Sequence, residues 1–366
     1  MEHSTTSSSS EKERAPSYLI VCFRYIGDVL VTTPLALSIK TAHPDAVVDY
    51  LVFEGTETIL AKNPHVRTVH TVAQGRAAIG KMLSLFRTYD VAIAAYPSDR
   101  TTIAAAIAGR YSIGLTNGWR KEWWKHLILD MHYVCYDYLH VVRTMLMPLR
   151  MLGVEPVPRV AVGFDQADKQ AARELVPFKR YVVLHPYSRN RLKCWPAAHW
   201  GRLAALIAGG TDCVPLFTVT PDPADREYLE NILEAAPKTV AVLAKPCNLN
   251  QLAAIIDGAV AYAGIDTLVT HVAAAVGVPT VAIFGPSWTR YWAPWPAGCE
   301  EFSPFIANRG IQRSGNVTVI QKEWECVPCN KESCRIGNGT GFECLEAIEP
   351  DEVFRALVPD MKTKID

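Results

Sequence analysis

The stretch Ala263–Pro286, AGIDTLVTHVAAAVGVPTVAIFGP, decides the fold that this sequence predicts. The apolar run that leads into it ends abruptly at Asp266, which indicates a buried strand with an acid at its carboxyl end. From Thr267 apolar residues recur at helical spacing until a glycine and a proline end the helix. A second strand follows at 280–284. Such a strand–helix–strand unit predicts a parallel sheet that binds ligands beyond the carboxyl ends of its strands, where helix N-termini attract phosphate.

Apolar strand patterns and helical patterns alternate along the rest of the chain, which favours parallel sheets covered on both faces. A strand, loop, helix and strand near the N-terminus have a counterpart that starts at 181, so we expect two doubly wound α/β domains. The predicted divisions are a disordered tail at 1–16, an N-terminal domain at 17–158, a linker at 159–178, a C-terminal domain at 179–348 with a Cys-rich segment at 326–344, and a C-terminal helix and tail at 349–366.

The composition excludes some classes of protein. The 366 residues include 37 Lys and Arg against 37 Asp and Glu, so no strong nucleic-acid field is expected. No apolar run reaches the ~18 residues of a membrane-spanning helix. The first 16 residues have no apolar segment typical of a signal peptide. We therefore expect a cytoplasmic protein with reduced cysteines.

Asp28 follows the first predicted strand, in the turn YIGD. An Asp there is commonly a helix N-cap, worth about 1 kcal/mol. The alternative is a general base that takes a proton from a substrate hydroxyl.

The segment 189–195, RNRLKCW, brings three cations to the end of another predicted strand. A solvated basic loop is the ordinary interpretation. The alternative is a diphosphate site in which Lys193 supplies a point charge and arginines supply paired donors. Ser188 and Arg191 are weaker candidates for the same site.

Asp266 and His271 each have a structural interpretation as well, the first as a helix cap and the second as a core histidine. Together with Thr267 at the start of a helix, they suit a nucleotide–sugar site, because backbone N–H groups and the helix dipole hold a diphosphate. Gly285 and Pro286 would shape the next loop along the same edge.

Two further segments carry unusual side chains. In 118–129, GWRKEWWKHLIL, basic and aromatic residues alternate. This pattern suits either a surface helix that packs its tryptophans inward or an interfacial patch that meets anionic lipid or phosphorylated sugar. The spacing of Cys326, Cys329, Cys334 and Cys344 suits a structural tetrahedral zinc site, and the alternative is a set of reduced thiols in a loop.

Several motifs resemble those of the heptosyltransferases of lipopolysaccharide core biosynthesis, glycosyltransferase family 9. In 266–285 the Asp-Thr pair, His271, the alanine run and the closing Phe-Gly match the family signature, and Leu268 stands where many members have Gly. RYIGDVLVTTP at 24–34 and KCWPAAHW at 193–200 are similar to two other family motifs. The resemblance covers nearly the whole chain after the tail. TVTPDPADREYLENIL, YWAPW and the cysteine segment look most like the heptosyltransferase III branch.

The resemblance implies a GT-B fold, two doubly wound Rossmann-like domains that face each other across a cleft. It implies an inverting transferase of Gram-negative bacteria that moves heptose from ADP-L-glycero-β-D-manno-heptose to the inner core of lipopolysaccharide, most like addition of the third heptose. The acceptor is a membrane-embedded lipid, so peripheral contact with the cytoplasmic face of the inner membrane is expected, and no cofactor is required.

The resemblance also implies roles for individual residues. Asp28 would be the catalytic base, Lys193 a phosphate ligand, and Asp266 and His271 would bind the donor and take part in catalysis. The residues expected at the acceptor are Gly27, Arg120, Lys121 and Lys125.

Two alternatives remain open: a related GT-B transferase that uses another nucleotide sugar, and a non-catalytic sugar- or lipid-binding protein. A Rossmann dehydrogenase is disfavoured, because YIGD replaces the G-x-G-x-x-G turn after the first strand.

Overall fold

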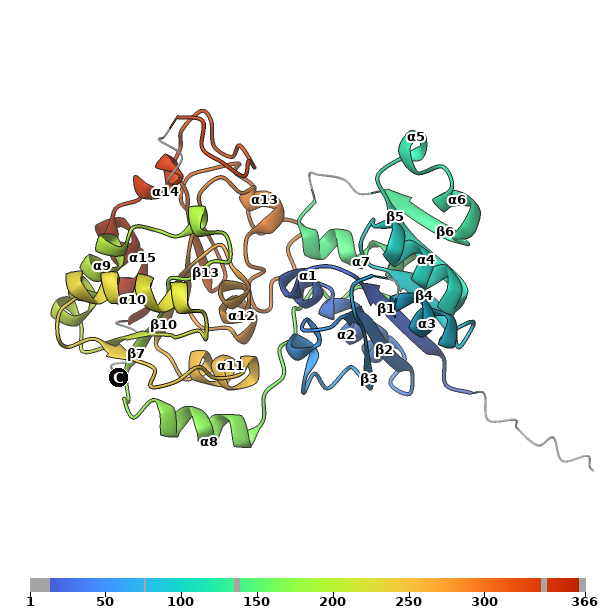
Figure 1. The fold of residues 1–366 in the computed structure, drawn as a ribbon, viewed down its shortest axis with the longest axis horizontal. Coiled ribbons are helices and arrows are strands. Elements are labelled where there is room, and N and C mark those ends of the chain that lie inside the picture. The colour runs from blue at the N-terminus through green and yellow to red at the C-terminus, as the bar shows by residue number, and fades with distance from the viewer. Residues whose placement is uncertain (1–13, 76, 135–138, 337–340, 362–366) are drawn as a thin grey trace, which may run out of the picture.

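The computed structural model describes residues 14–75, 77–134, 139–336 and 341–361. The chain forms two halves, each built on a sheet with helices on both faces (Figure 1). Nearly all of the tail predicted at 1–16 lies outside the described residues. Among the residues that are described, no helix combines the length and the apolar character needed to cross a bilayer.

The N-terminal sheet has the strand order β3-β2-β1-β4-β5-β6, and every neighbouring pair is parallel. Its strands are β1 (Ser17–Cys22), β2 (Val47–Phe53), β3 (Thr68–Val72), β4 (Tyr89–Ala94), β5 (Gly109–Thr116) and β6 (Met131–Val134). Its helices are α1 (Ile26–Val31), α2 (Thr33–Ala42), the 3-10 helix η1 (Glu57–Leu60), α3 (Ala77–Ser84), α4 (Asp99–Ala108), α5 (Trp119–Glu122), α6 (Lys125–Ile128) and α7 (Val141–Met151).

Helices α1 and α2 replace the single helix that the periodicity predicts at 29–42. The break falls at Thr32, two residues before Pro34 in the first turn of α2. Proline has no N–H to donate, and its ring collides with the carbonyl four residues earlier, so a continuous helix is disfavoured there. The break separates the short α1, which carries Asp28, from the longer helix that packs on the sheet.

The C-terminal sheet has the order β12-β13-β11-β10-β7-β8-β9, parallel except for the antiparallel pair β12–β13. Its strands are β7 (Tyr181–His185), β8 (Val214–Phe217), β9 (Ala241–Val242), β10 (Ala261–Ile265), β11 (Thr280–Ile283), β12 (Gln312–Ser314) and β13 (Val317–Ile320). Its helices are the 3-10 helix η2 (Arg191–Lys193), α9 (Ala197–Gly210), α10 (Pro223–Ala235), α11 (Leu249–Asp257), α12 (Leu268–Val276), α13 (Thr289–Trp292) and α14 (Glu343–Glu346). The strand–helix–strand unit predicted from 263–286 is confirmed as β10, α12 and β11.

Two further helices complete the chain. The segment predicted as a linker at 159–178 contains α8 (Gln166–Leu175), which begins with a capping box between Asp165 and Asp168 and packs on α11. Lys62 of the N-terminal half donates to Asp168 at 2.6 Å. The last helix, α15 (Pro350–Met361), packs on α9 of the C-terminal half.

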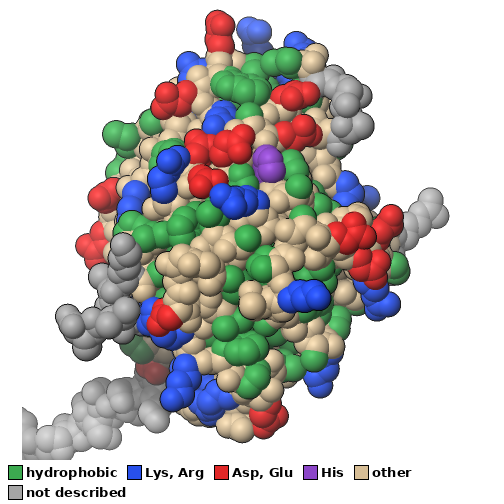
Figure 2. Space-filling view, turned by 90° about the vertical axis from the view of Figure 1, so that its left-hand side faces the viewer, with side chains coloured by type: hydrophobic (Ala, Val, Ile, Leu, Met, Phe, Trp, Pro, Cys, Tyr) green, Lys and Arg blue, Asp and Glu red, His purple; other side chains and the backbone are tan. Residues whose placement is uncertain are grey.

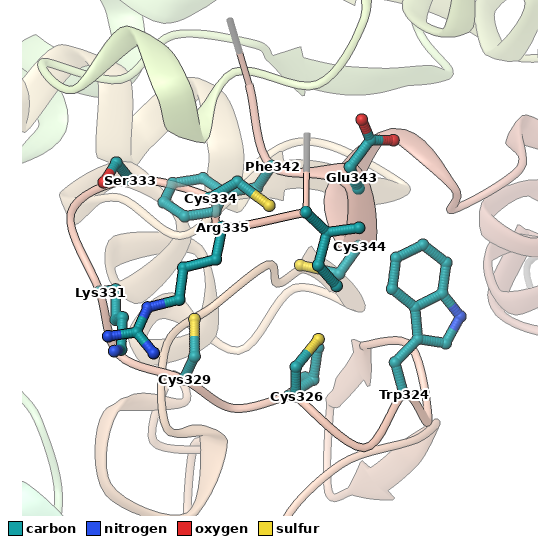
Figure 3. Close-up of a pocket in the computed structure, with 12 residues that line it drawn as sticks. Trp324, Cys326, Cys329, Lys331, Ser333, Cys334, Arg335, Phe342, Glu343 and Cys344 are labelled. Atoms are coloured by element: carbon teal, nitrogen blue, oxygen red, sulfur yellow. The ribbon is translucent and has the colours of Figure 1, made fainter. Parts of the chain in front are cut away.

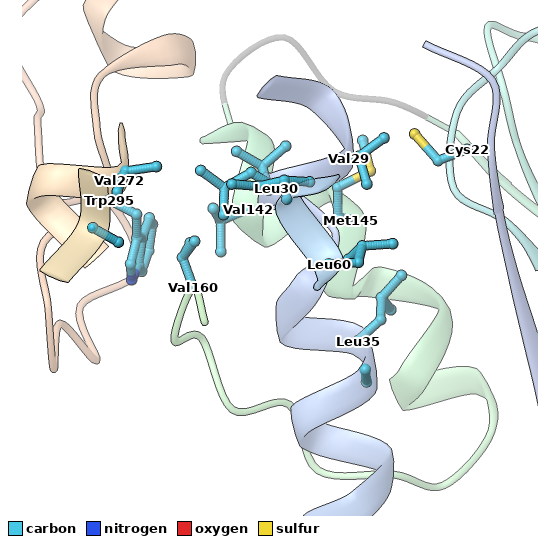
Figure 4. Close-up of a cluster of buried hydrophobic side chains, with 14 of the residues drawn as sticks. Cys22, Val29, Leu30, Leu35, Leu60, Val142, Met145, Val160, Val272 and Trp295 are labelled. Carbon is cyan, nitrogen blue, oxygen red and sulfur yellow. The ribbon is translucent and has the colours of Figure 1, made fainter. Parts of the chain in front are cut away.

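One apolar cluster joins the two halves. Figure 4 shows Leu30 of α1 and Val142 of α7 on the side that faces Val272 of α12 and Trp295. All four side chains are buried. A polar contact reinforces this cluster, since the ring Nε2 of buried His140 lies 2.7 Å from the carbonyl oxygen of Ala293. The cluster therefore fixes α1 against α12.

Candidate active site

Three side chains meet at the carboxyl ends of the neighbouring strands β7, β10 and β11. Lys193 lies in η2 after β7, Asp266 directly follows β10, and Ser287 follows β11. The Lys193 Nζ donates to Asp266 Oδ2 at 2.7 Å, and Ser287 Oγ donates to the same oxygen at 2.6 Å. Lys193 Nζ also lies 3.3 Å from Ser287 Oγ. The parallel sheet brings these residues together although the chain separates them by up to 94 positions.

The cation determines the charge state of Asp266. Burial by itself would raise the pKa of this carboxyl, because the charged form loses hydration. The Lys193 ammonium, the Ser287 hydroxyl and His271 outweigh this effect, so the pKa of Asp266 is lowered from its ordinary value. Asp266 is therefore ionised at neutral pH.

Helix α12 starts at Leu268, two residues after Asp266, and turns its positive end toward the same edge of the sheet. Its N-cap, Thr267, makes no side-chain cap bond, and the buried Thr267 hydroxyl has no hydrogen-bond partner in the described part of the chain. Free backbone N–H groups at a helix N-terminus attract anions. The helix end, this hydroxyl and Lys193 together suit a bound phosphate group.

His271 lies one turn into α12 and is partly buried. Burial lowers its pKa, Asp266 opposes that shift, and Lys193 lowers the pKa further. The net shift is downward, so the ring is neutral at neutral pH and has a nitrogen that can accept a hydrogen bond.

Asp28 lies in the first turn of α1 and its side chain is only 11% exposed. Tyr25, not Asp28, is the N-cap residue of this helix, so the simple capping interpretation does not apply. Burial raises the pKa of the Asp28 carboxyl; the Arg24 guanidinium, 3.7 Å away, and a backbone hydrogen bond from Tyr25 oppose that shift but do not cancel it. A carboxylate with a raised pKa is a better proton acceptor than an ordinary one.

The N-cap residue of the helix that carries Asp28 contacts the loop that precedes Lys193. The Arg189 guanidinium lies over the Tyr25 ring, 5.1 Å from its centroid, and α1 contacts α12. The Asp28 turn of one half therefore faces the loop before Lys193 in the other.

Other predicted donor residues have partners of their own. Arg191 forms ion pairs with Asp225 and, at 3.8 Å, with Asp222. The Ser188 hydroxyl accepts the N–H of Asn190 at 3.3 Å, which makes it part of the turn. Gly285 and Pro286 give their carbonyl oxygens to Gln321 and to the Asn330 N–H. These residues shape the loops around Lys193 and Asp266.

The predicted acceptor residues separate into two places. Gly27 lies in α1 beside Asp28, and the space where a Cβ would stand is open. Arg120 and Lys121 are exposed on α5, at the far end of the N-terminal half (Figure 1).

Lys125 does not fit the acceptor role. Its side chain is fully buried and its Nζ pairs with Glu122 at 2.6 Å and Asp99 at 3.2 Å. Of the two interpretations of 118–129, a single surface helix with inward tryptophans does not hold, because α5 and α6 are separate short helices and Trp123 is 57% exposed.

The four cysteines predicted to bind zinc line one cavity, with Cys326 and Cys329 on one side and Cys334 and Cys344 on the other (Figure 3). Burial, and then the neighbouring thiols, raise the pKa of Cys344 to about 12. Among the described residues, however, no group of three or more His, Cys, Asp or Glu is placed so that it could hold a metal ion. The zinc site stays a prediction.

Sequence reasoning missed Ser287 and Arg24. Ser287 directly follows the predicted Gly285-Pro286 pair, so its place after a parallel strand was a usable signal. Arg24 lies over the Tyr96 ring, 4.3 Å from its centroid, as well as beside Asp28. The contact with Tyr96 joins positions 72 residues apart, and no local pattern reports it.

Comparison with known proteins identifies relatives. The model of glycosyltransferase family 9 (heptosyltransferase) matches residues 77–336. Lipopolysaccharide heptosyltransferase 3 of Escherichia coli is 28% identical over 304 residues, which cover 76% of this chain and 86% of that protein.

Solved structures share the fold. The glycosyl transferase family 9 protein from Veillonella parvula DSM 2008 has a TM-score of 0.76 at 20% identity, over 95% of this chain and 98% of that chain. E. coli heptosyltransferase WaaC with ADP has a TM-score of 0.68 at 21% identity, over 94% and 99%. These likenesses confirm the predicted GT-B fold.

We predict that Lys193→Met raises the pKa of His271, because the substitution removes a positive charge that opposes ring protonation and leaves Asp266 without its cation. Asp266→Asn should lower the pKa of His271. NMR titration of the histidine ring protons measures both. Arg191→Met, in the same loop but paired with Asp225, serves as the control and should leave His271 unchanged. A lower His271 pKa in Lys193→Met would contradict the predicted electrostatics.

Proposed function

This chain belongs to glycosyltransferase family 9. We propose that it transfers heptose from ADP-L-glycero-β-D-manno-heptose to the inner core of lipopolysaccharide, and that the heptose it adds is the third one. The chain is a glycosyltransferase by family. The observation that carries the proposed donor is the set of Lys193, Ser287 and the α12 N-terminus at one sheet edge, which suits a diphosphate. The proposed acceptor rests on the relatives, which include lipopolysaccharide heptosyltransferases.

In the proposed donor complex, the ADP diphosphate lies between Lys193 and the first turn of α12. Thr267 has a free hydroxyl for a phosphate oxygen. Asp266 keeps Lys193 extended toward the site, because the two side chains are ion-paired. The neutral His271 ring supplies a hydrogen-bond acceptor or donor for the sugar or phosphate.

The proposed reaction is a single inverting displacement. An acceptor hydroxyl oxygen attacks the anomeric carbon of the heptose while the bond from that carbon to the β-phosphate oxygen breaks. The hydroxyl proton passes to the Asp28 carboxylate, and ADP leaves with the bonding electron pair. Lys193 and the helix dipole stabilise the negative charge that grows on ADP. Since protein groups supply this stabilisation, the proposed step needs no active-site metal.

The proposed acceptor site adjoins Asp28 in the N-terminal half, where Gly27 leaves room for a close approach. Closure of the two halves would exclude water and protect the donor from hydrolysis. We place the reaction at the cytoplasmic face of the membrane that holds the lipid acceptor.

We also propose a structural zinc ion at Cys326, Cys329, Cys334 and Cys344. The proposal rests on the spacing of these cysteines in the sequence and on the cavity that all four line. Metal analysis of the purified protein would decide it.

Selective ADP binding tests the donor site. In calorimetric titrations with ADP, GDP, UDP and NAD, we expect only ADP to bind strongly. Lys193→Ala should weaken ADP binding about 10- to 100-fold, the range for loss of a charge-assisted hydrogen bond. Lys238→Ala, an exposed lysine after α10, is the matched control. Stronger binding of UDP or GDP would leave the fold intact and remove heptose as the proposed sugar.

Asp28→Asn tests catalysis. Turnover should fall about 10²- to 10⁴-fold while ADP affinity stays unchanged, because only the proton acceptor is lost. In the parent protein, activity should fall as pH falls through the pKa of Asp28, which lies above the ordinary 3.8. Asp45→Asn, an exposed position, is the control. A parent protein that binds ADP without any turnover would favour the non-catalytic alternative.

A further inference from the structure

Helix α3 and the turn that follows it carry two sets of apolar side chains. One set is buried in the cluster of the N-terminal sheet: Ala78 and Met82 of α3 and Leu85 of the turn. The other set is Ile79 and Leu83 of α3 and Phe86 of the turn, which are 51%, 56% and 64% exposed. The described chain covers only the first set.

The exposed apolar side chains continue onto neighbouring helices. α3 contacts α4 and α4 contacts α6, and Figure 1 shows α3–α6 together at the end of the molecule away from the C-terminal half. The four added residues are Ile103, Trp123, Leu127 and Ile128. We call these four together with Ile79, Leu83 and Phe86 the α3–α6 surface. Exposed apolar side chains gathered on neighbouring helices mark an interaction site.

The charge around the α3–α6 surface is positive although the whole chain is neutral. Residues 77–130 contain seven Lys and Arg but four Asp and Glu. Asp99 and Glu122 both pair with the buried Lys125. Asp130 accepts two hydrogen bonds from Ser112, and Asp90 pairs with arginines.

The acids of this segment therefore have partners within the protein, whereas several cations point outward. The exposed cations are Arg87, Arg100, Arg120 and Lys121, together with Arg110, which also pairs with Asp90. The opposite end, formed by the C-terminal half, mixes acidic and basic side chains over its face (Figure 2). The excess of positive charge therefore distinguishes the end of the molecule that α3–α6 form.

We propose that the α3–α6 surface docks this protein on an anionic lipid bilayer. Its apolar side chains enter the headgroup region, and its arginines and lysines pair with lipid phosphates. Charge complementarity selects this occupant, because a second copy of the same positive surface would be repelled. The inference rests on the proposed function in one respect: the proposed acceptor is embedded in a lipid membrane, which gives the protein a reason to dock there.

The position of the surface relative to Asp28 suits this role. α3 and α4 cover one face of the N-terminal sheet, and α1, α2 and α7 belong to the cluster on the other face, which continues into the C-terminal half. The docked face therefore stays outside the cleft. α4 also begins three residues after Tyr96, whose ring contacts Arg24, the partner of Asp28. A lipid acceptor beside the first turn of α4 would be close to the proposed base.

Sedimentation with lipid vesicles tests the proposal on the full chain. We expect binding to vesicles of phosphatidylglycerol and phosphatidylcholine in equal parts, and much less to phosphatidylcholine alone. Leu83→Glu/Phe86→Glu should weaken binding at least about tenfold, and Arg87→Glu/Arg100→Glu should do so most at low salt. Phe302→Glu/Ile306→Glu, two exposed apolar residues of the C-terminal half, is the matched control. Unchanged thermal midpoints show that each variant folds.

The outcomes separate docking from the proposed reaction, because the vesicles contain no sugar acceptor and turnover is measured with a delipidated acceptor in solution. Vesicle binding that these substitutions reduce supports the proposal, whether or not heptose is transferred. No binding to anionic vesicles, or binding that only the control changes, overturns it. A dimer that Leu83→Glu/Phe86→Glu converts to a monomer, without vesicle binding, would assign the surface to a second copy and also overturn it.

Discussion

The geometry of the site depends on the packing of α1 against α12. Leu30 and Val272 are buried in the cluster that joins the two halves, and burial of an aliphatic side chain contributes about 1.5–3 kcal/mol. The same two helices carry Asp28 and His271. A contact that stabilises the joined halves therefore also sets the distance between groups of the proposed acceptor and donor sites. A change in the angle between the halves would move the two groups relative to each other without altering either local structure.

The Lys193–Asp266 ion pair shows how the site keeps charges that burial disfavours. Taking a carboxylate out of water costs free energy, and only a close cation with hydrogen bonds offsets that cost. Asp266 obtains both, from Lys193 and from Ser287. Because each partner comes from a different strand end, the pair forms only when the sheet order is correct. In the proposed donor complex, an incoming diphosphate would find Lys193 already oriented by Asp266, so less reorganisation accompanies binding.

The sequence predicts the parts of the site that follow from periodicity and strand ends. Asp266, His271 and Lys193 could be placed at one sheet edge because β10, α12 and β7 have clear apolar patterns. Lys125 and Trp123 could not be assigned, because α5 and α6 are too short for a helical period to say which side faces inward. The buried Lys125 depends on Asp99 and Glu122, one of them 26 positions away. Helix α8 was not predicted, because Leu175 is the only large apolar residue within its bounds. A capping box and contact with α11 stabilise it.

The raised pKa of Asp28 indicates that this position costs stability. When the folded-state pKa of a carboxyl lies above its unfolded value, the folded state binds the proton more tightly, so ionisation favours unfolding. This cost is absent below the ordinary value of 3.8, grows as pH rises toward the folded pKa, and is fully present above the folded pKa. An asparagine would fit the same turn without that cost. Retaining a buried carboxylate next to Arg24, in a helix that contacts α12, is therefore what the proposed general base requires and what stability alone would not select.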